Sequence, residues 1–555
     1  MAKRTGAQHL VEALRRNGAD MAFCVPGESY LAVLDALHDH EDAIRLITCR
    51  QEGGAANMAE AYGKLTGRPG ICMVTRGPGA TNASIGVHTA FQDSTPMILF
   101  IGQVAKGDIE REAFQEIDYR RMFGQMAKWV AQIDDAARVP EFVNRAFATA
   151  MSGRPGPVVL ALPEDMLVEA AEAADLAPAP RSEGAPAPEA MDQLASMLSA
   201  AQRPMLMLGG GGWTREASDN FRAFAEHFDL PVITSFRAKD RLDNAHPNYV
   251  GDMGIGADPA LVKRIQECDL LIVAGPRLGE MTTGGYARLA VPRMGPKLVH
   301  VHPGAEELNR VYQADLAINA GVTSFSRALM RLQPPKDMAW RAWRKDARAA
   351  YEAFIQPVTP PGSVNPSKIF AWLNARIGKD AIITNGAGNY AGWAHRFFLH
   401  RQFPSQIAPT SGAMGYGVPA AIAAKLVHPE RPVVALAGDG CFLMNGQELA
   451  TARQYNVPVI FLVFNNGMYG TIRMHQETHF PARKIATDLV NPDFAALARA
   501  YGISGVRVER TEDFAPAFEA ALASNGPALI ELTIDPEAIT PTTTLSAIRK
   551  KAQST

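Results

Sequence analysis

Long apolar runs are missing from this chain of 555 residues, and none approaches the length that crosses a bilayer. The first ten residues also lack the apolar segment of a secretion signal. An excess of charge of one sign is missing too, because 55 lysines and arginines nearly balance 57 aspartates and glutamates. This balance gives no support for nucleic-acid or membrane binding. We therefore expect a cytoplasmic protein.

Cysteine is scarce as well. The five cysteines are scattered, odd in number and without the spacing of a zinc site. Most lie within apolar segments, so we expect buried, reduced thiols. Cys441 differs because it directly follows Gly440, and its backbone N–H could face a phosphate.

The length and the hydrophobic content of 47% predict a globular protein with about three domains. Helical segments alternate with short apolar segments, which predicts an α/β fold with three doubly wound parallel sheets. The predicted domains comprise residues 1–170, 191–335 and 366–540. Two linkers, rich in alanine, proline or polar residues, are predicted at 171–190 and 336–365. The Thr-rich tail 541–555 could be disordered or form a flexible lid.

Apolar segments mark the expected strands of each sheet. In the first domain they are residues 21–25, 44–48, 71–75, 97–102 and 157–162. In the central domain they are residues 205–208, 231–234, 270–274 and 298–302. In the third domain they are residues 382–384, 432–437, 457–464 and 528–532.

Four consecutive glycines, 209–212, follow the first strand of the central domain. Glycines after a strand can let backbone N–H groups approach a nucleotide phosphate. The segment has neither a P-loop pattern nor a clean G-x-G-x-x-G, and close packing of a helix on the strand would also explain it. The pattern leaves both interpretations open.

Asp439 lies between two glycines after the apolar segment 432–437, and Asn465 and Asn466 follow the apolar segment 457–464. The order strand, loop, helix, strand brings both loops to the carboxyl edge of a parallel sheet, where such sheets bind ligands. Carboxylate and amide oxygens suit Mg²⁺, and the glycines would admit a phosphate. We therefore predict a metal-bridged diphosphate. The alternative is an ordinary turn, because a G-x-G triplet arises by chance about four times in such a composition.

The 27 positions from Asp439 to Asn466 resemble the thiamine-diphosphate signature of the acetolactate synthase and pyruvate decarboxylase family. Five further segments resemble the acetolactate synthase branch in the same order: residues 50–62, 77–82, 113–116, 152–157 and 411–417. The resemblance covers nearly the whole chain. It implies thiamine diphosphate and Mg²⁺ as cofactors, pyrimidine binding by the first domain, diphosphate binding by the third, and a homodimer or homotetramer with sites between subunits.

The resemblance also gives individual residues a role. Glu52 would protonate and hydrogen-bond the aminopyrimidine ring of the cofactor, in an apolar site that strengthens this interaction. By itself it could equally be a glutamate that the helix dipole favours at a helix start. Met414 would hold the cofactor in its bent shape, and the carbonyl of Gly412 would accept a hydrogen bond from the cofactor's amino group.

Three residues are the implied metal ligands: Asp439, Asn466 and the backbone carbonyl of Met468. The remaining implied contacts to the cofactor are Asn389, Tyr390, Gly438, Gly440 and Cys441.

Several positions depart from the branch. Met281 stands where an arginine that holds the acceptor's carboxylate is expected, His475 replaces a substrate-selecting tryptophan, and Glu164 replaces a lysine. Loss of the carboxylate clamp argues against a second 2-keto acid as the acceptor. Arg277 is retained at a position that faces a flavin in the branch.

Glu28 occupies a position where acetolactate synthases have glycine and pyruvate decarboxylases have an acid. A carboxylate there could relay protons, and the alternative is a solvated turn residue. Gln115 and His475 are the other candidate hydrogen-bond donors of the substrate pocket. The predicted catalytic residues are therefore Glu52, Glu28, Gln115 and His475.

The favoured hypothesis is a thiamine-diphosphate carboligase of the acetolactate synthase type, which decarboxylates a 2-keto acid to an enamine that adds to an acceptor. A non-ligating decarboxylase or an aldehyde lyase is the first alternative. A flavin-linked 2-keto acid oxidase is the second, and leaves open whether the central domain binds FAD, ADP or nothing. A regulatory subunit with a dead site is the third, which the retained Glu52 disfavours.

Overall fold

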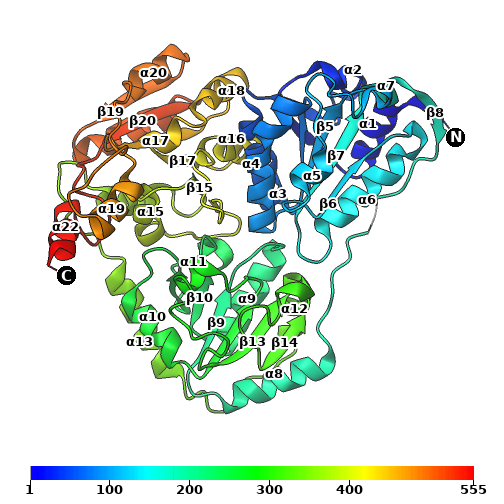
Figure 1. The fold of residues 1–555 in the computed structure, drawn as a ribbon. Coiled ribbons are helices and arrows are strands. Elements are labelled where there is room, and N and C mark those ends of the chain that lie inside the picture. Colours follow the sequence, from blue (N-terminus) through cyan, green and yellow to red (C-terminus); the bar gives the residue numbers. More distant parts are fainter. Residues whose placement is uncertain (1, 179, 555) are drawn as a thin grey trace. The chain divides into compact units, whose positions relative to one another are not determined.

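The computed structural model describes residues 2–178 and 180–554 (Figure 1). The chain forms two compact units, one of Met1–Ser182 with Ile422–Val427 and one of Glu183–Ala421 with His428–Thr555. Three six-stranded sheets are present, one in the first unit and two in the second. This confirms the predicted α/β fold with three parallel sheets. Within the described residues, no helix has the length and apolar character needed to span a bilayer.

The N-terminal sheet is entirely parallel, in the order β3-β2-β4-β5-β7-β6. Its strands are β2 (Met21–Cys24), β3 (Arg45–Thr48), β4 (Gly70–Val74), β5 (Met97–Gln103), β6 (Trp129–Gln132) and β7 (Pro157–Pro163). The helices of this unit are α1 (Gly6–Arg16), α2 (Leu31–His38), α3 (Glu52–Thr66), α4 (Gly77–Asp93), α5 (Tyr119–Phe123), α6 (Val139–Met151) and α7 (Glu164–Val168). A short antiparallel pair, β1 (Ala2–Thr5) and β8 (Ala170–Ala173), joins the two ends of the domain.

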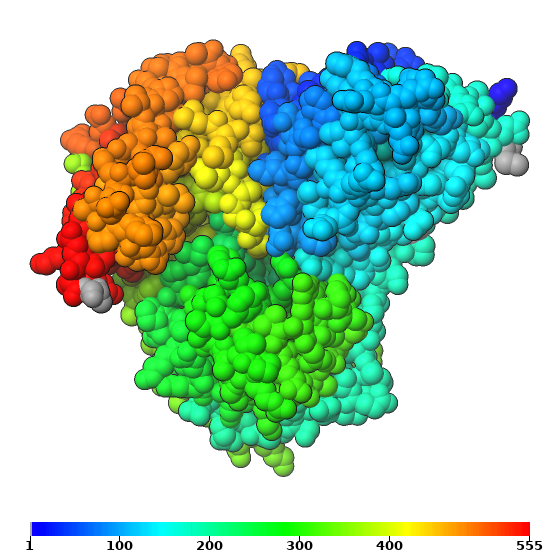
Figure 2. Space-filling model, viewed as in Figure 1, coloured from blue at the N-terminus to red at the C-terminus, as the bar shows by residue number. Residues whose placement is uncertain are grey.

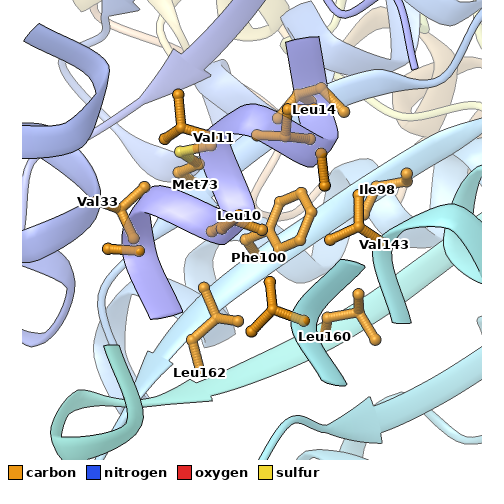
Figure 3. Packing of buried hydrophobic residues seen from close by; sticks show 14 of the residues in the cluster. Leu10, Val11, Leu14, Val33, Met73, Ile98, Phe100, Val143, Leu160 and Leu162 are labelled. Atoms are coloured by element: carbon orange, nitrogen blue, oxygen red, sulfur yellow. The ribbon is translucent and has the colours of Figure 1, made fainter. Parts of the chain in front are cut away.

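Helix α1 shows why the N-terminal core forms where it does. The hydroxyl of Thr5 accepts a hydrogen bond from the backbone N–H of Gln8, and the Gln8 side chain accepts one from the N–H of Thr5, which caps the helix start. Behind this cap, Leu10 and Leu14 point into a cluster with Phe100 of β5 (Figure 3). The apolar stripe of the helix therefore covers one face of the sheet.

The central sheet is also parallel, in the order β11-β10-β9-β12-β13-β14. Its strands are β9 (Pro204–Leu208), β10 (Val232–Ser235), β11 (Tyr249–Met253), β12 (Leu270–Ala274), β13 (Lys297–His302) and β14 (Leu316–Asn319). Its helices are α8 (Pro188–Ala200), α9 (Arg215–His227), α10 (Pro259–Glu267), α11 (Glu280–Thr283), α12 (Val322–Leu329) and α13 (Arg341–Phe354).

Helix α13 lies in the stretch 336–365 that we predicted to be a linker. It is anchored to the central domain, because the Arg348 guanidinium donates to the carbonyls of Asn244, His246 and Tyr249 at 2.9–3.0 Å. The ring of Tyr351 packs edge-on against that of Tyr249. Much of this stretch therefore belongs to the packed structure.

The C-terminal sheet is parallel as well, in the order β16-β15-β17-β18-β20-β19. Its strands are β15 (Ile382–Asn385), β16 (Gln406–Ile407), β17 (Val433–Gly438), β18 (Ile460–Asn465), β19 (Ser504–Val508) and β20 (Ala528–Thr533). The helices of this part are α14 (Pro366–Ile377), α15 (Tyr390–Phe397), α16 (Gly417–Val427), α17 (Asp439–Phe442), α18 (Leu449–Gln454), α19 (Gly470–His479), α20 (Phe494–Ala500), α21 (Phe514–Ala523) and α22 (Leu545–Gln553).

The tail contains helix α22, which packs on α19 rather than remaining disordered. The surfaces of α22 (red) and of the α19 region (orange) lie side by side in Figure 2. Arg549 of α22 donates twice, at 2.7 Å, to the carboxylate of Glu477 on α19. The Glu477 side chain is only 1% exposed and also accepts from Arg473 at 3.1 Å. The tail is therefore tied to α19 by a buried carboxylate.

Candidate active site

A cavity of about 270 Å³ opens at the carboxyl edge of the C-terminal sheet. Its walls come from the loops after β15, β17 and β18, from the loop before α16, and from the start of α19. The cofactor contacts predicted in this domain all line it: Asn389, Tyr390, Gly412, Met414, Gly438, Asp439, Gly440, Cys441, Asn466 and Met468. The structure therefore brings together residues that are up to about 80 positions apart in the sequence.

Asp439 is the first residue of the short helix α17, directly after β17. Its Oδ1 accepts from the N–H of Gly440 at 2.9 Å, and its Oδ2 accepts from the N–H of Gly467 at 2.8 Å. Burial raises the pKa of the Asp439 carboxyl above its ordinary value, although these hydrogen bonds act in the opposite direction. A cation at this edge would offset the cost of a buried negative charge.

Asn491 is a site residue that sequence reasoning missed. Its Nδ2 donates to Asp439 Oδ2 at 2.8 Å and to Asn465 Oδ1 at 3.0 Å. Its own Oδ1 is buried without a hydrogen-bond partner among the described residues. No local pattern pointed to it, since it precedes Pro492 in a segment with no motif. Its amide ties the ends of β17 and β18 together.

The loop after β18 is held in place by the backbone. The N–H of Tyr469 donates to the carbonyl of Thr487 at 2.9 Å, and the N–H of Leu489 donates to that of Gly467 at 2.8 Å. These bonds fix the backbone on both sides of Met468. A carboxylate, an amide and a backbone carbonyl, from Asp439, Asn466 and Met468, form a donor set of oxygen atoms that suits Mg²⁺. Elsewhere in the described part of the chain, no cluster of three His, Cys, Asp or Glu side chains offers a metal site.

Two glycines of the motif admit aromatic rings that pack directly on the backbone. A Cβ atom at Gly438 would lie 2.9 Å from the Tyr390 ring, and one at Gly440 would lie 2.5 Å from the Tyr469 ring. Any side chain at position 440 would therefore displace the wall of the cavity.

The thiol of Cys441 takes part in the structure of the site. Its Sγ accepts from the N–H of Gly415 at 3.2 Å and lies 3.4 Å from the hydroxyl of Tyr390. That hydroxyl accepts from the N–H of Gly386 at 3.0 Å. Burial raises the pKa of the Cys441 thiol, which keeps it protonated. All five cysteines are free and buried, which confirms that expectation.

Helix α19 forms one side of the cavity and presents its residues unequally. Thr471 lines the cavity and donates through its hydroxyl to Asn389 Oδ1 at 2.9 Å. His475 lies on the exposed side of the helix, stacked near His479, and does not line the cavity. No contact in this unit therefore supports the predicted role of His475 in the substrate pocket.

The other predicted catalytic residues lie in the N-terminal unit. Glu52 is the first residue of α3, and its Oε2 accepts from Asn82 Nδ2 on α4 at 2.9 Å. Gln115 adopts a left-handed backbone conformation with φ of 64° and packs on Gly77 at the start of α4. Glu28 begins a short 3₁₀ helix, η1 (Glu28–Tyr30).

Arg76 joins two of the acidic positions and was missed by the sequence analysis. Its guanidinium donates to Glu28 at 3.2 Å and to Glu164 at 3.1 Å. The ring of Phe114 lies 5.9 Å away, within the range of a cation–π contact. Arg76 itself is buried, while both carboxylates are exposed. Glu28 is therefore an exposed but paired residue, not a freely solvated one.

Comparison with known proteins agrees with this fold. Family models of the thiamine pyrophosphate enzymes match the chain in three places: the N-terminal TPP binding domain at residues 4–122, the central domain at 191–329 and the C-terminal TPP binding domain at 386–532. The chain therefore belongs to the thiamine pyrophosphate enzyme family; thiamine pyrophosphate is another name for thiamine diphosphate.

Within this family the chain is similar to acetolactate synthases. It is 34% identical over 545 residues to the acetolactate synthase large subunit of Parasynechococcus marenigrum, covering 96% of this chain and 87% of the relative. It is 32% identical over 533 residues to the isozyme 2 large subunit of Escherichia coli, covering 96% and 95%. The mitochondrial catalytic subunit of Saccharomyces cerevisiae is 30% identical over 563 residues, covering 96% and 81%. The protein is thus a thiamine-diphosphate-dependent enzyme that resembles acetolactate synthase.

Proposed function

We propose that the protein uses thiamine diphosphate and Mg²⁺ to decarboxylate a 2-keto acid and to transfer the remaining acyl group to an acceptor. The observation that carries this proposal is the single cavity lined by every cofactor contact predicted in the C-terminal domain. The cofactor supplies the carbanion chemistry, and the protein supplies binding, orientation and electrostatics.

Asp439, Asn466 and the carbonyl of Met468 would hold Mg²⁺ between themselves and the diphosphate. Gly438 and Gly440 let the rings of Tyr390 and Tyr469 pack on the backbone beside the place proposed for the diphosphate. Support for this assignment comes from the buried Asp439 carboxylate, whose hydrogen-bond partners Gly440, Gly467 and Asn491 carry no cationic side chain.

Glu52 would protonate and hydrogen-bond the pyrimidine end of the cofactor, while Met414 and Gly412 would hold its bent shape. Asn82 orients the Glu52 carboxylate in the N-terminal unit. Glu52 and Asp439 belong to different compact units of the chain. We propose a homodimer or homotetramer in which two subunits complete each site, as the family resemblance implies. Five free thiols also favour a reducing compartment such as the cytoplasm.

The proposed acceptor differs from the second 2-keto acid that the acetolactate synthase resemblance would imply. Met281, in α11, offers no charge to a second carboxylate. Glu28 and Gln115 belong to the loops around Arg76 and Gly77, so both can contribute polar groups to the acyl-transfer site. We therefore favour an aldehyde as acceptor over a second 2-keto acid, and a non-ligating decarboxylase or aldehyde lyase remains the alternative outcome.

The experiment is a screen of 2-keto acids with thiamine diphosphate and Mg²⁺ in which CO₂ release and carbon–carbon bond products are measured separately. CO₂ with a ligated product supports a carboligase, and CO₂ with a free aldehyde supports a decarboxylase. If no 2-keto acid releases CO₂, the proposed function is wrong. Full activity of the Glu52→Gln variant would refute the proposed role of Glu52.

A flavin-linked 2-keto acid oxidase is the second candidate, and the topology of the central sheet favours it. The loops after β9 and β12 flank the switch point of that sheet, where nucleotides bind in doubly wound folds. Gly210 and Gly275 both have positive φ, and a Cβ atom at Gly210 would lie 2.1 Å from the Gly275 carbonyl oxygen. A yellow purified protein that reduces a dye with pyruvate would support FAD here, and a colourless one would count against it.

A further inference from the structure

Arg237 of the central domain reaches the loops that form the cofactor cavity of the C-terminal domain. It follows β10 and precedes the 3₁₀ helix η4 (Lys239–Arg241). Its guanidinium donates to the carbonyl oxygens of Gly386, at 2.8 Å, and Pro409. Arg237 is buried, with only 8% of its surface exposed. A charged group has therefore been brought into the interior to bind two backbone carbonyls.

These two carbonyls belong to two separate segments of the chain that lead into the lining of the cavity. Gly386 follows β15 and begins the loop whose next four residues, 387–390, line the cavity. Pro409 begins the turn that carries Gly412 and Met414. The Pro409 oxygen also accepts from the N–H of Gly412 at 3.1 Å, so Arg237 and Gly412 share one acceptor. The guanidinium thus fixes the turn that presents Gly412 to the cavity.

The backbone of Arg237 is held in a conformation that its side chain disfavours. Its φ is 58°, in the left-handed region that few residues other than glycine adopt. Anchors on the same segment maintain this conformation: Asp240 Oδ2 accepts from the N–H groups of Ser405 and Gln406 at 2.9 and 3.1 Å, and the N–H of Lys239 donates to Gln406 Oε1 at 2.8 Å. Such strain persists only where the surroundings over-determine it.

We propose that Arg237 is a positioning residue for the cofactor, through which the central domain sets the separation of the loops 386–390 and 409–414. The identity of the cofactor rests on the proposed function. The planar guanidinium presents two parallel donors at a fixed spacing, which a lysine ammonium cannot reproduce. Through Arg237, the central domain would then influence the affinity for thiamine diphosphate, although Arg237 does not itself line the cavity.

The test is calorimetric titration of thiamine diphosphate, with Mg²⁺ present, into apo-protein. Arg237→Ala should bind the cofactor about 10- to 100-fold more weakly than the parent, as expected when a supporting contact behind a binding group is lost. Arg237→Lys, which keeps the charge and should fold, is expected to fall between the two. A low concentration of guanidinium ion, well below that which unfolds proteins, should restore part of the affinity of Arg237→Ala.

Arg348→Ala is the matched control, because Arg348 also donates to backbone carbonyls but only within the central domain. It should lower the unfolding temperature without changing cofactor affinity. Equal affinity in Arg237→Ala and the parent would overturn the proposal, and so would an equal loss of affinity in Arg348→Ala. A parent protein that does not bind thiamine diphosphate at all would instead refute the proposed function.

Discussion

Replacing Asn491 by alanine removes an amide that binds the predicted metal ligand Asp439 and also Asn465, the neighbour of the predicted ligand Asn466. Its Nδ2 donates to Asp439 Oδ2 at 2.8 Å and to Asn465 Oδ1 at 3.0 Å. After the substitution, Asp439 keeps the backbone donors of Gly440 and Gly467. The carboxylate should therefore stay near its position but lose the constraint that ties it to the end of β18.

The size of the effect follows from the two lost hydrogen bonds. A bond to a charged acceptor contributes about 1.5–3 kcal/mol and one to a neutral acceptor about 0.5–1.5 kcal/mol. Since two backbone donors remain on Asp439, we expect the free energy of Mg²⁺ binding to weaken by the lower end of this range, about 1.5–2 kcal/mol. At about 1.4 kcal/mol for each factor of ten, Mg²⁺ affinity should fall about 10- to 30-fold.

The assay is a Mg²⁺ titration of thiamine diphosphate binding, read by calorimetry at fixed cofactor concentration. Asn374→Ala is the matched control: Asn374 donates to the Phe397 carbonyl at 2.7 Å and accepts from the Leu399 N–H at 2.9 Å, away from the cavity. It should destabilise the fold to a similar extent and leave the Mg²⁺ midpoint unchanged. An unchanged midpoint in Asn491→Ala, or an equal shift in Asn374→Ala, would refute the reasoning.

Three further predictions concern the carboxylate of Glu52, the glycine at position 440 and the C-terminal helix α22. Glu52→Gln should reduce CO₂ release about 100-fold or more while thiamine diphosphate still binds, because a carboxamide cannot protonate the ring; turnover and calorimetry measured together check this. Gly440→Ala should abolish cofactor binding, since its Cβ would lie 2.5 Å from an aromatic ring, whereas Gly279→Ala, with open space around it, should not. Hydrogen bonding by Arg549 lowers the pKa of Glu477 from 4.5 to about 2. The stabilising carboxylate is therefore present above pH 4.5 and lost as the pH falls toward 2. The protection factors of the α22 amides, in which the intrinsic pH dependence of hydrogen exchange is divided out, should thus be constant from neutral pH to about pH 5 and decrease below that, whereas in Arg549→Ala they should be low throughout.

Most of the strands that were predicted from the sequence are buried on both faces. They consist of continuous apolar segments, such as Leu270–Ala274, whose bounds the structure reproduces. The predicted strand 44–48 is an exception, because β3 lies at a sheet edge and is only partly buried. The strands that were missed lie mostly at sheet edges. In β14, Leu316–Asn319, buried and exposed residues alternate, and in β19, Ser504–Val508, most residues are exposed. Four or five residues with so little apolar character do not stand out from a loop.

The candidate site divides in a similar way. Residues within the motifs, such as Asp439 and Asn466, could be predicted because their type and spacing carry the chemistry directly. The residues that support the candidate site or its surrounding loops, Asn491, Arg76 and Arg237, could not be predicted. Each of them acts on a segment that is distant in the sequence. Arg237, for example, donates to carbonyls 149 and 172 positions away. Backbone carbonyls are available everywhere, so no local pattern identifies the partner of such a side chain.

The departures of the N-terminal unit from the acetolactate synthase branch are physically coupled rather than independent. Glu28 and Glu164 stand where that branch is expected to have glycine and lysine, and both carboxylates bind the same Arg76 guanidinium. A lysine at position 164 would face that buried guanidinium with a like charge, and a glycine at position 28 would remove one of its two acceptors. Each acid therefore pairs with Arg76, and neither expected residue could accept a hydrogen bond from it through its side chain. Because these positions flank the loops that carry Gly77 and Gln115, the change in charge pattern lies near the place where substrate selection was predicted, and it supports the proposed change of acceptor.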